Sequence, residues 1–256
     1  MSPTPFPVLF FKRILNFEKE TVAQREQRHA RRYEVTPASP LRATLQLGGH
    51  AHTGALANLS SSGASLQVPS TTEATRGQAG GLAFTLDAHQ LTIDCEVAHV
   101  QPSGSHTTLG LALKFADYEI QKAYLQLLEP VAIGASLIPA NAGVLRQHEP
   151  GMITEQYDGP NDARLTIWRN FAGQSVHGFE FRMHDYFVRS HGTPPGMEIY
   201  TCEEQSAAHK QGYAVPALQK AGEQSDEIRQ LFRWVVPHLS QAVPDDTRVF
   251  LGQFVA

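Results

Sequence analysis

Six short segments with strand character follow one another between residues 41 and 115, with no helical segment between them. The clearest is 91–100, in which apolar and polar residues alternate at the period of two that is typical of a half-buried strand. Turns rich in glycine and serine, such as Gly48-Gly49, separate the segments. The other five segments are 41–47, 53–59, 64–68, 81–86 and 107–115. Short strands at this spacing favour an antiparallel barrel or sandwich.

After the last of these segments the hydrophobic period becomes helical. Tyr118, Tyr124 and Leu127 fall along one side of a helix that we expect to end near Pro130. One helix in this position can close the open end of a small barrel. Residues 131–150 are rich in Ala, Gly and Pro and contain few charges, which predicts a linker.

The second half of the chain returns to strand patterns and ends in helices. Four strands are expected between stretches of Asn, Gly and Pro, namely 164–169, 176–182, 186–190 and 197–202. A helix is expected from Ser225 and is ended or kinked by Pro237, and a short final helix is expected around 247–254. The pattern predicts a chain that is mainly β with α, in which 151–256 form a small α+β domain of unknown role.

Composition places the chain among globular proteins. Of its 256 residues, 41% are hydrophobic and 18% are charged, which excludes a disordered or collagen-like chain. Cys95 and Cys202 are too few for a disulfide framework, so we expect a cytoplasmic protein. The apolar stretch 6–11 is far shorter than the roughly 20 residues of a membrane-spanning helix. Its charges follow it rather than precede it, so we expect neither a transmembrane segment nor a signal peptide.

Residues 1–24 are expected to form an N-terminal amphipathic segment. Within it, 7–17 can form a weakly apolar helix through Leu9, Phe11 and Leu15. Such a helix binds a membrane or a partner protein, or it packs on its own domain, and the second arrangement is the more common one.

Positive charge is concentrated near the start of the chain. Residues 1–42 contain 8 Lys and Arg against 4 Asp and Glu, whereas the whole chain has a net charge of −4. The guanidinium of arginine suits phosphate, and the acceptor edge of guanine, better than an ammonium does. The excess charge lies in Arg25, Arg28, Arg31 and Arg32. Such a cluster is most often a solvated helix face. Because no aromatic residues are interleaved with the arginines, general nucleic-acid binding is the least favoured function.

A polar turn ends the second expected strand. It has the order Asn58-x-Ser60-x-x-Gly63. Asn and Ser side chains cap local backbone groups, and they also offer an amide and a hydroxyl to the edge of a base. Glycine permits a close approach of the backbone or a positive φ. Alone, this is a common turn.

Together, the two motifs resemble the PilZ domain family. The family pattern has an Arg-x-x-x-Arg element before the first strand, here Arg28 and Arg32, and an Asp/Asn-x-Ser-x-x-Gly turn after the second strand. The similarity extends to the strand 109–115 and covers about residues 25–130. It implies a six-stranded antiparallel barrel with a closing helix over 25–130.

The resemblance also implies a binding site, because the family binds the bacterial second messenger cyclic di-GMP. Arg28 and Arg32 are expected to contact phosphates and the Hoogsteen edge of guanine, which match the guanidinium fork. Asn58 and Ser60 are expected to hydrogen-bond the guanine, and Gly63 to shape the turn. Further candidates on the arginine segment are Gln27 and Arg31. Because the position before the first motif arginine is not itself an arginine, one bound nucleotide and an intercalated pair both stay open.

The implied function is that of an effector rather than an enzyme. The arginine segment is expected to wrap the ligand and to act as a conformational switch on a protein partner, reached through the N-terminal segment or through 151–256. The family-level processes are motility, pili and exopolysaccharide. The alternative is a PilZ-fold protein-interaction module that does not bind nucleotide, and the retained arginines favour binding.

No motif indicates catalysis or a metal site. None of the 12 histidines lies in a His-Glu-x-x-His motif, and the two cysteines form no Cys-x-x-Cys pair. Residues 173–178 lack the Gly-x-Ser-x-Gly order of a nucleophile turn. The acidic pairs Glu203-Glu204 and Asp245-Asp246 are typical of solvated loops or helix starts. We therefore expect no catalytic residue, no metal and no cofactor other than the ligand.

Overall fold

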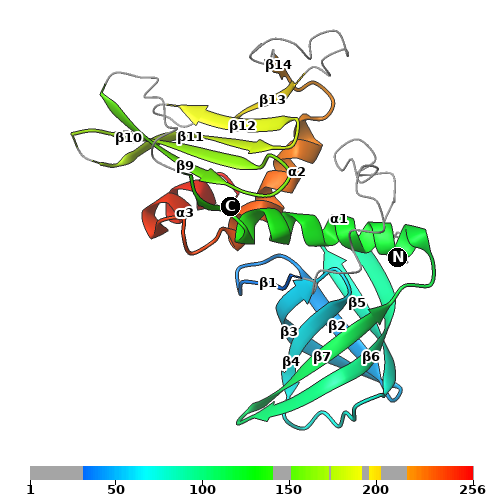
Figure 1. Cartoon of the computed structure of the whole chain (residues 1–256). Coiled ribbons are helices and arrows are strands. Elements are labelled where there is room, and N and C mark those ends of the chain that lie inside the picture. The colour runs from blue at the N-terminus through cyan, green and yellow to red at the C-terminus, as the bar shows by residue number, and fades with distance from the viewer. Residues whose placement is uncertain (1–30, 141–150, 173, 192–195, 203–217, 256) are drawn as a thin grey trace. The chain divides into compact units, whose positions relative to one another are not determined.

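The computed structural model describes residues 31–140, 151–172, 174–191, 196–202 and 218–255. The chain divides into two compact units, Met1–Val131 and Ala132–Ala256. The first contains a β-barrel, and the second contains a separate antiparallel sheet with helices (Figure 1). The expectation of a mainly β chain with some α is confirmed.

Six antiparallel strands close the barrel of the first unit. Their order is β3-β2-β5-β6-β7-β4, and β4 pairs again with β3, which completes the circle. A seventh, very short strand, β1 (Tyr33–Glu34), pairs with the end of β3. The six barrel strands are β2 (Arg42–Leu47), β3 (His50–Ser60), β4 (Gly63–Pro69), β5 (Ala79–Leu86), β6 (His89–Ser103) and β7 (His106–Lys114). The predicted six-stranded antiparallel barrel is confirmed.

The barrel consists of two three-stranded meanders. β2, β3 and β4 form the first through consecutive pairing, and β5, β6 and β7 form the second. The two meanders join along β2–β5 and along β4–β7. The second junction, called here the β4–β7 seam, pairs Gly63 with Ala112 and Ser65 with Gly110.

Alternation along the strands creates the core of the barrel. Inward positions carry apolar residues that are almost completely buried, because successive side chains of a strand point to opposite faces. The largest of them are Leu45, Leu59, Leu66, Leu82, Phe84, Ile93 and Leu109. Cys95 also lies in this core, where burial raises the pKa of its thiol to about 11. This cysteine is therefore a protonated apolar residue at neutral pH.

The closing helix is longer than expected. α1 spans Tyr118–Ala135, so the predicted end near Pro130 is wrong, and the proline lies inside the helix. The residues that follow it, such as Val131 and Ile133, are apolar and buried, and this burial offsets the hydrogen bond that a proline removes. Part of the expected linker is accordingly helix, and Ile138–Pro139 form the short strand β8, while 141–150 lie outside the described residues.

The second unit contains a seven-stranded antiparallel sheet in the order β14-β13-β12-β11-β10-β9-β8. The four predicted strands are present as β10 (Arg164–Asn170), β11 (Val176–Met183), β12 (Tyr186–His191) and β13 (Glu198–Cys202). The strands β9 (Met152–Asp158) and β14 (Leu218–Lys220) were not predicted. Most residues of β9 are half-buried and several are polar, so its sequence lacks a clear alternation.

Helices near the end of the chain cover one face of this sheet. α2 (Ser225–Val235) starts at the predicted residue, and a 3-10 turn at Val236–His238 follows it, in agreement with the expected break at Pro237. Phe232 of α2 stacks on Phe179 of β11 with ring centroids 5.5 Å apart. The last helix, α3 (Asp245–Gly252), begins two residues earlier than expected.

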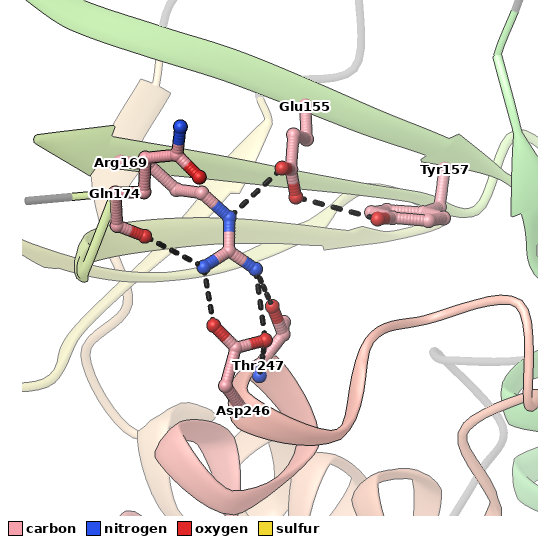
Figure 2. A network of polar contacts seen from close by, with 6 residues as sticks. All are labelled: Glu155, Tyr157, Arg169, Gln174, Asp246 and Thr247. Carbon is pink, nitrogen blue, oxygen red and sulfur yellow. Dashed lines mark hydrogen bonds and ion pairs between the residues drawn. The ribbon is translucent and has the colours of Figure 1, made fainter. Parts of the chain in front are cut away.

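One buried arginine joins this sheet to α3. The guanidinium of Arg169 on β10 donates to Glu155 Oε1 at 2.8 Å and to the carbonyl oxygen of Gln174 at 2.9 Å (Figure 2). It also binds both carboxylate oxygens of Asp246 and donates to Thr247 Oγ1 at 2.7 Å. The Arg169 cluster thus links two strands of the sheet to the first turn of a helix.

In the Arg169 cluster, one guanidinium lies between two carboxylates. The hydrogen bonds with Asp246 raise the pKa of Arg169 and lower the pKa of the carboxyl group. Tyr157 donates to Glu155 Oε2 at 3.3 Å, and burial together with that carboxylate raises the pKa of its hydroxyl to about 12. Arg169 and Asp246 therefore stay charged, and Tyr157 stays neutral, across the neutral range. The groups of the cluster are hydrogen-bonded to one another, which is typical of a structural ion network.

His238 makes the stability of the second unit depend on pH. Its side chain is 3% exposed, its Nδ1 has no hydrogen-bond partner in the described residues, and burial lowers its pKa from 6.5 to about 4. The unfolded chain therefore binds more protons between these values. The contribution of neutral His238 to the stability of the unit is fully present above pH 6.5 and is lost as the pH falls towards 4. Through His238 alone, we expect the free energy of unfolding to fall by about 2 kcal/mol between pH 7 and pH 5.

Tryptophan fluorescence can measure this effect, because both tryptophans of the chain, Trp168 and Trp234, are buried in the second unit. Urea unfolding at pH 7 and pH 5 should show this fall in the free energy of unfolding for the wild type and a smaller fall for His238→Leu. Equal losses in both proteins would assign the pH dependence to other groups.

Candidate functional site

A groove of about 720 Å³ lies on the outer surface of the barrel. This volume falls within the range of small-molecule sites, about 300–1,000 Å³. The floor carries small side chains on both sides of the β4–β7 seam, and polar side chains rise around it. The lining residues are Arg32, Asn58, Ser60, Ser62, Gly63, Ala64, Ser65, Ala98, His99, Gln101, Thr108, Gly110, Leu111 and Ala112.

One wall of the groove, called here the motif wall, consists of Arg32, Asn58 and Ser60. Arg32 directly precedes β1, and β1 pairs Glu34 with Asn58. A bulge in β3 leaves Ala57 outside the regular ladder, and its carbonyl oxygen accepts a hydrogen bond from the Val35 amide at 3.0 Å. Two short segments that are distant in sequence are therefore held side by side, and this places Arg32 next to the polar turn.

The turn itself is a tight hairpin between β3 and β4. Ser60 pairs with Gly63, and only Ser61 and Ser62 lie between them. The hydroxyl of Ser60 donates to the carbonyl oxygen of Gly63 at 3.3 Å, and the carbonyl oxygen of Ser62 accepts from the Leu113 amide at 2.9 Å. Hydrogen bonds within the turn and across the seam thus fix the shape of the motif wall.

Glycine is required at position 63 by close packing rather than by backbone conformation. The residue is not among the glycines with positive φ in the described chain. A Cβ added there would lie 2.9 Å from the carbonyl oxygen of Leu111 on the neighbouring strand. Of the two explanations that the sequence left open, the structure supports the close approach.

A buried tyrosine holds the turn from inside the barrel. The hydroxyl of Tyr124 on α1 donates to the carbonyl oxygen of Ser60 at 2.7 Å and lies 3.3 Å from that of Gly63. Its ring packs between Phe84 and Phe115, with centroids 5.6 and 5.5 Å away. Burial raises the pKa of the Tyr124 hydroxyl, so it stays a hydrogen-bond donor at any physiological pH.

We expect Tyr124→Phe to lower the free energy of unfolding by about 1–2 kcal/mol, because the carbonyl oxygen of Ser60 loses a buried donor. Amide hydrogen exchange in residues 60–63 should also become faster. Urea unfolding followed by circular dichroism and exchange mass spectrometry measures both effects. The matched control is Tyr118→Phe, since Tyr118 lies on the same helix and is 59% exposed. Equal behaviour of the two variants would contradict this role of Tyr124.

The opposite wall, called here the β6–β7 wall, consists of His99, Gln101 and Thr108. A bulge in β6 between Val97 and His99 shifts the register, so that Ala98 and His99 are both exposed. The sequence pattern does not predict this wall. The alternation of apolar residues in 91–100 cannot reveal a bulge, because one inserted residue reverses which side chains face outward.

Four of the residues predicted for the site converge in the groove: Arg32, Asn58, Ser60 and Gly63. Arg31 does not line it, and its guanidinium lies over the ring of Tyr33, 5.4 Å from the centroid. Gln27 and Arg28 lie outside the described residues. Within the described ranges, no group of three His, Cys, Asp or Glu side chains is placed to hold a metal ion. No described helix is both long and apolar enough to cross a membrane.

Comparison with known families agrees with this geometry. Residues 26–129 match the sequence profile of the PilZ domain. This part of the chain is a PilZ domain. The match ends within α1, so the PilZ domain includes the barrel, the groove and the part of α1 that carries Tyr124.

Two solved structures are similar to the chain at low sequence identity. One is the complex of MrkH from K. pneumonia with c-di-GMP, with 16% identity and a TM-score of 0.35; the match covers 41% of this chain and about half, 51%, of MrkH. The other is PlzA from Borreliella burgdorferi in complex with c-di-GMP, with 10% identity and a TM-score of 0.31; the match covers 79% of this chain and 94% of PlzA. No curated protein matches the sequence.

Proposed function

We propose that the PilZ domain binds cyclic di-GMP in the barrel groove and that the chain is an effector that responds to this nucleotide. The observation that supports the proposal most directly is the convergence of Arg32, Asn58 and Ser60 on one wall of the groove. Two separate sequence motifs supply these residues, and neither motif alone is specific for a nucleotide.

The chemistry of the motif wall suits a guanine nucleotide. An arginine fork pairs with phosphate oxygens, or with O6 and N7 of guanine, through two parallel hydrogen bonds. The amide of Asn58 and the hydroxyl of Ser60 add donors and acceptors for the base edge. Among the described residues that line the groove there is no carboxylate, so its charge favours an anionic ligand.

The proposal extends to the arginine segment. We place Arg28, and with it Gln27 and Arg31, around the bound nucleotide, so that binding reorganises residues 25–32 and thereby signals to a protein partner. The partner would be reached through the N-terminal segment or the second unit. Motility, pili and exopolysaccharide synthesis are the processes we propose for such a bacterial, cytoplasmic receptor. An unchanged hydrogen-exchange pattern in residues 1–40 on ligand addition would contradict the switch.

Calorimetric titration of the full chain with cyclic di-GMP tests the site. We expect selective binding over GTP and cyclic di-AMP, and an affinity roughly 10- to 100-fold lower in Arg32→Ala, since one bidentate contact is lost. The matched control is Arg76→Ala, because Arg76 is an exposed arginine of the same unit that does not line the groove. The stoichiometry distinguishes one nucleotide from an intercalated pair.

Two results would contradict the proposed function. The first is the absence of binding by the folded wild type, which would favour a protein-interaction module. The second is an equal loss of affinity in Arg32→Ala and Arg76→Ala, which would indicate general charge attraction rather than a site.

A further inference from the structure

The two sequence motifs account for only one side of the groove. The motif wall belongs to β3 and to the residue that precedes β1, whereas the β6–β7 wall belongs to the other meander of the barrel. Between the walls, the floor is built from small residues of β4 and β7, namely Gly63, Ser65, Gly110 and Ala112. The small side chains of this floor leave room for a planar group above it.

The walls are too far apart for a single nucleobase to contact both. β3, β4, β7 and β6 are consecutive neighbours in the sheet, and Asn58 and His99 stand at the two ends of one row of paired residues across them, so three strand spacings separate these two residues, or roughly 14 Å along the sheet. The groove volume of about 720 Å³ also lies in the upper part of the range for small-molecule sites. The groove therefore has the extent of a ligand with two nucleobases.

His99 is the aromatic side chain of the β6–β7 wall. It is exposed, and the β6 bulge directs it outward beside Ala98. Gly110 lies directly opposite on β7, and a Cβ added there would be 3.2 Å from the Cβ of His99. The glycine thus leaves space next to the imidazole, where a larger residue would press on it. An aromatic side chain can stack on any nucleobase, because every base has a π face.

We propose that the β6–β7 wall is a second subsite, in which His99 stacks on the nucleobase that lies farther from Arg32, while Gln101 and Thr108 offer hydrogen bonds to its edge. The inference rests on the proposed function, since cyclic di-GMP carries two guanines that can occupy one wall each. Selection of a dinucleotide then depends on residues that neither sequence motif contains.

The test measures cyclic di-GMP affinity by calorimetry in full-length variants. We expect His99→Ala to bind about 10-fold more weakly and His99→Phe to bind nearly as well as the wild type, because phenylalanine retains a stacking face. His106→Ala is the matched control, since His106 begins β7 and does not line the groove. In the double variant of Asn58→Ala and His99→Ala, the fold-losses of affinity of the two single variants should multiply, because the two side chains act on different bases.

Wild-type affinity in His99→Ala, or equal weakness of the Ala and Phe variants, would overturn the second subsite. A double variant no weaker than Asn58→Ala alone would also overturn it, by placing both side chains on the same base. In these cases Arg32→Ala still loses affinity, so the proposed function stands. Failure of the wild type to bind cyclic di-GMP rejects the proposed function and the second subsite with it.

Discussion

Phe232→Ala is expected to lower the free energy of unfolding of the second unit by about 4 kcal/mol. The ring of Phe232 is completely buried and stacks on Phe179, and it meets Phe181 edge-on with centroids 6.1 Å apart. Its removal loses the apolar contact area between α2 and the sheet and leaves a cavity that neighbouring strands cannot fill. This is the largest single effect that we predict for the chain.

Urea unfolding followed by tryptophan fluorescence measures this loss in the second unit. Phe171→Ala is the matched control, because Phe171 directly follows β10, is 72% exposed, and its removal should change stability by no more than about 0.5 kcal/mol. Similar losses in both variants would mean that α2 does not depend on this ring for its attachment to the sheet.

Arg169→Met is expected to lower the free energy of unfolding of the same unit by about 3 kcal/mol. The Arg169 side chain is 8% exposed, and its loss leaves the carboxylates of Glu155 and Asp246 close together without a cation between them. Breaking a buried ion pair costs about 3–5 kcal/mol. We expect the lower end of this range, because the Asp246 side chain is 57% exposed and can be hydrated.

The same strand offers a matched control for this substitution. Arg164 lies on β10, where it bonds to Asp158 at 2.8 Å, and the two side chains are 51% and 42% exposed. Arg164→Met should therefore cost less than about 1 kcal/mol. If the two methionine variants unfold at the same urea concentration, the Arg169 cluster is no more important than a surface ion pair.

The sequence was sufficient for the parts of the fold that local patterns determine. The six barrel strands were predicted because each carries its own alternation and ends in its own turn. The turn that carries Asn58, Ser60 and Gly63 is also a local pattern of one hairpin, but its expected binding role came from the family resemblance. The role of Arg32 came from the same resemblance, and the pairing of β1 that places Arg32 beside the turn was not predicted.

The failures share a physical cause, since each depends on contacts that are distant in sequence. Pro130 is a helix breaker by local preference, yet α1 continues because the residues beyond it are buried. The β6–β7 wall depends on a bulge, which changes the direction of His99 without changing the composition of the strand. Arg169 could be recognised in the sequence only as one more charged residue.

The position of the groove across the β4–β7 seam couples ligand binding to the folding of the barrel. Each meander supplies one wall, so neither half contains the site alone. A ligand that touches both walls binds only the closed barrel, and each tenfold excess over its Kd adds about 1.4 kcal/mol to the free energy of unfolding. Under the proposed function, the ligand would therefore also protect the barrel from proteolysis, because proteases act on transiently opened chains.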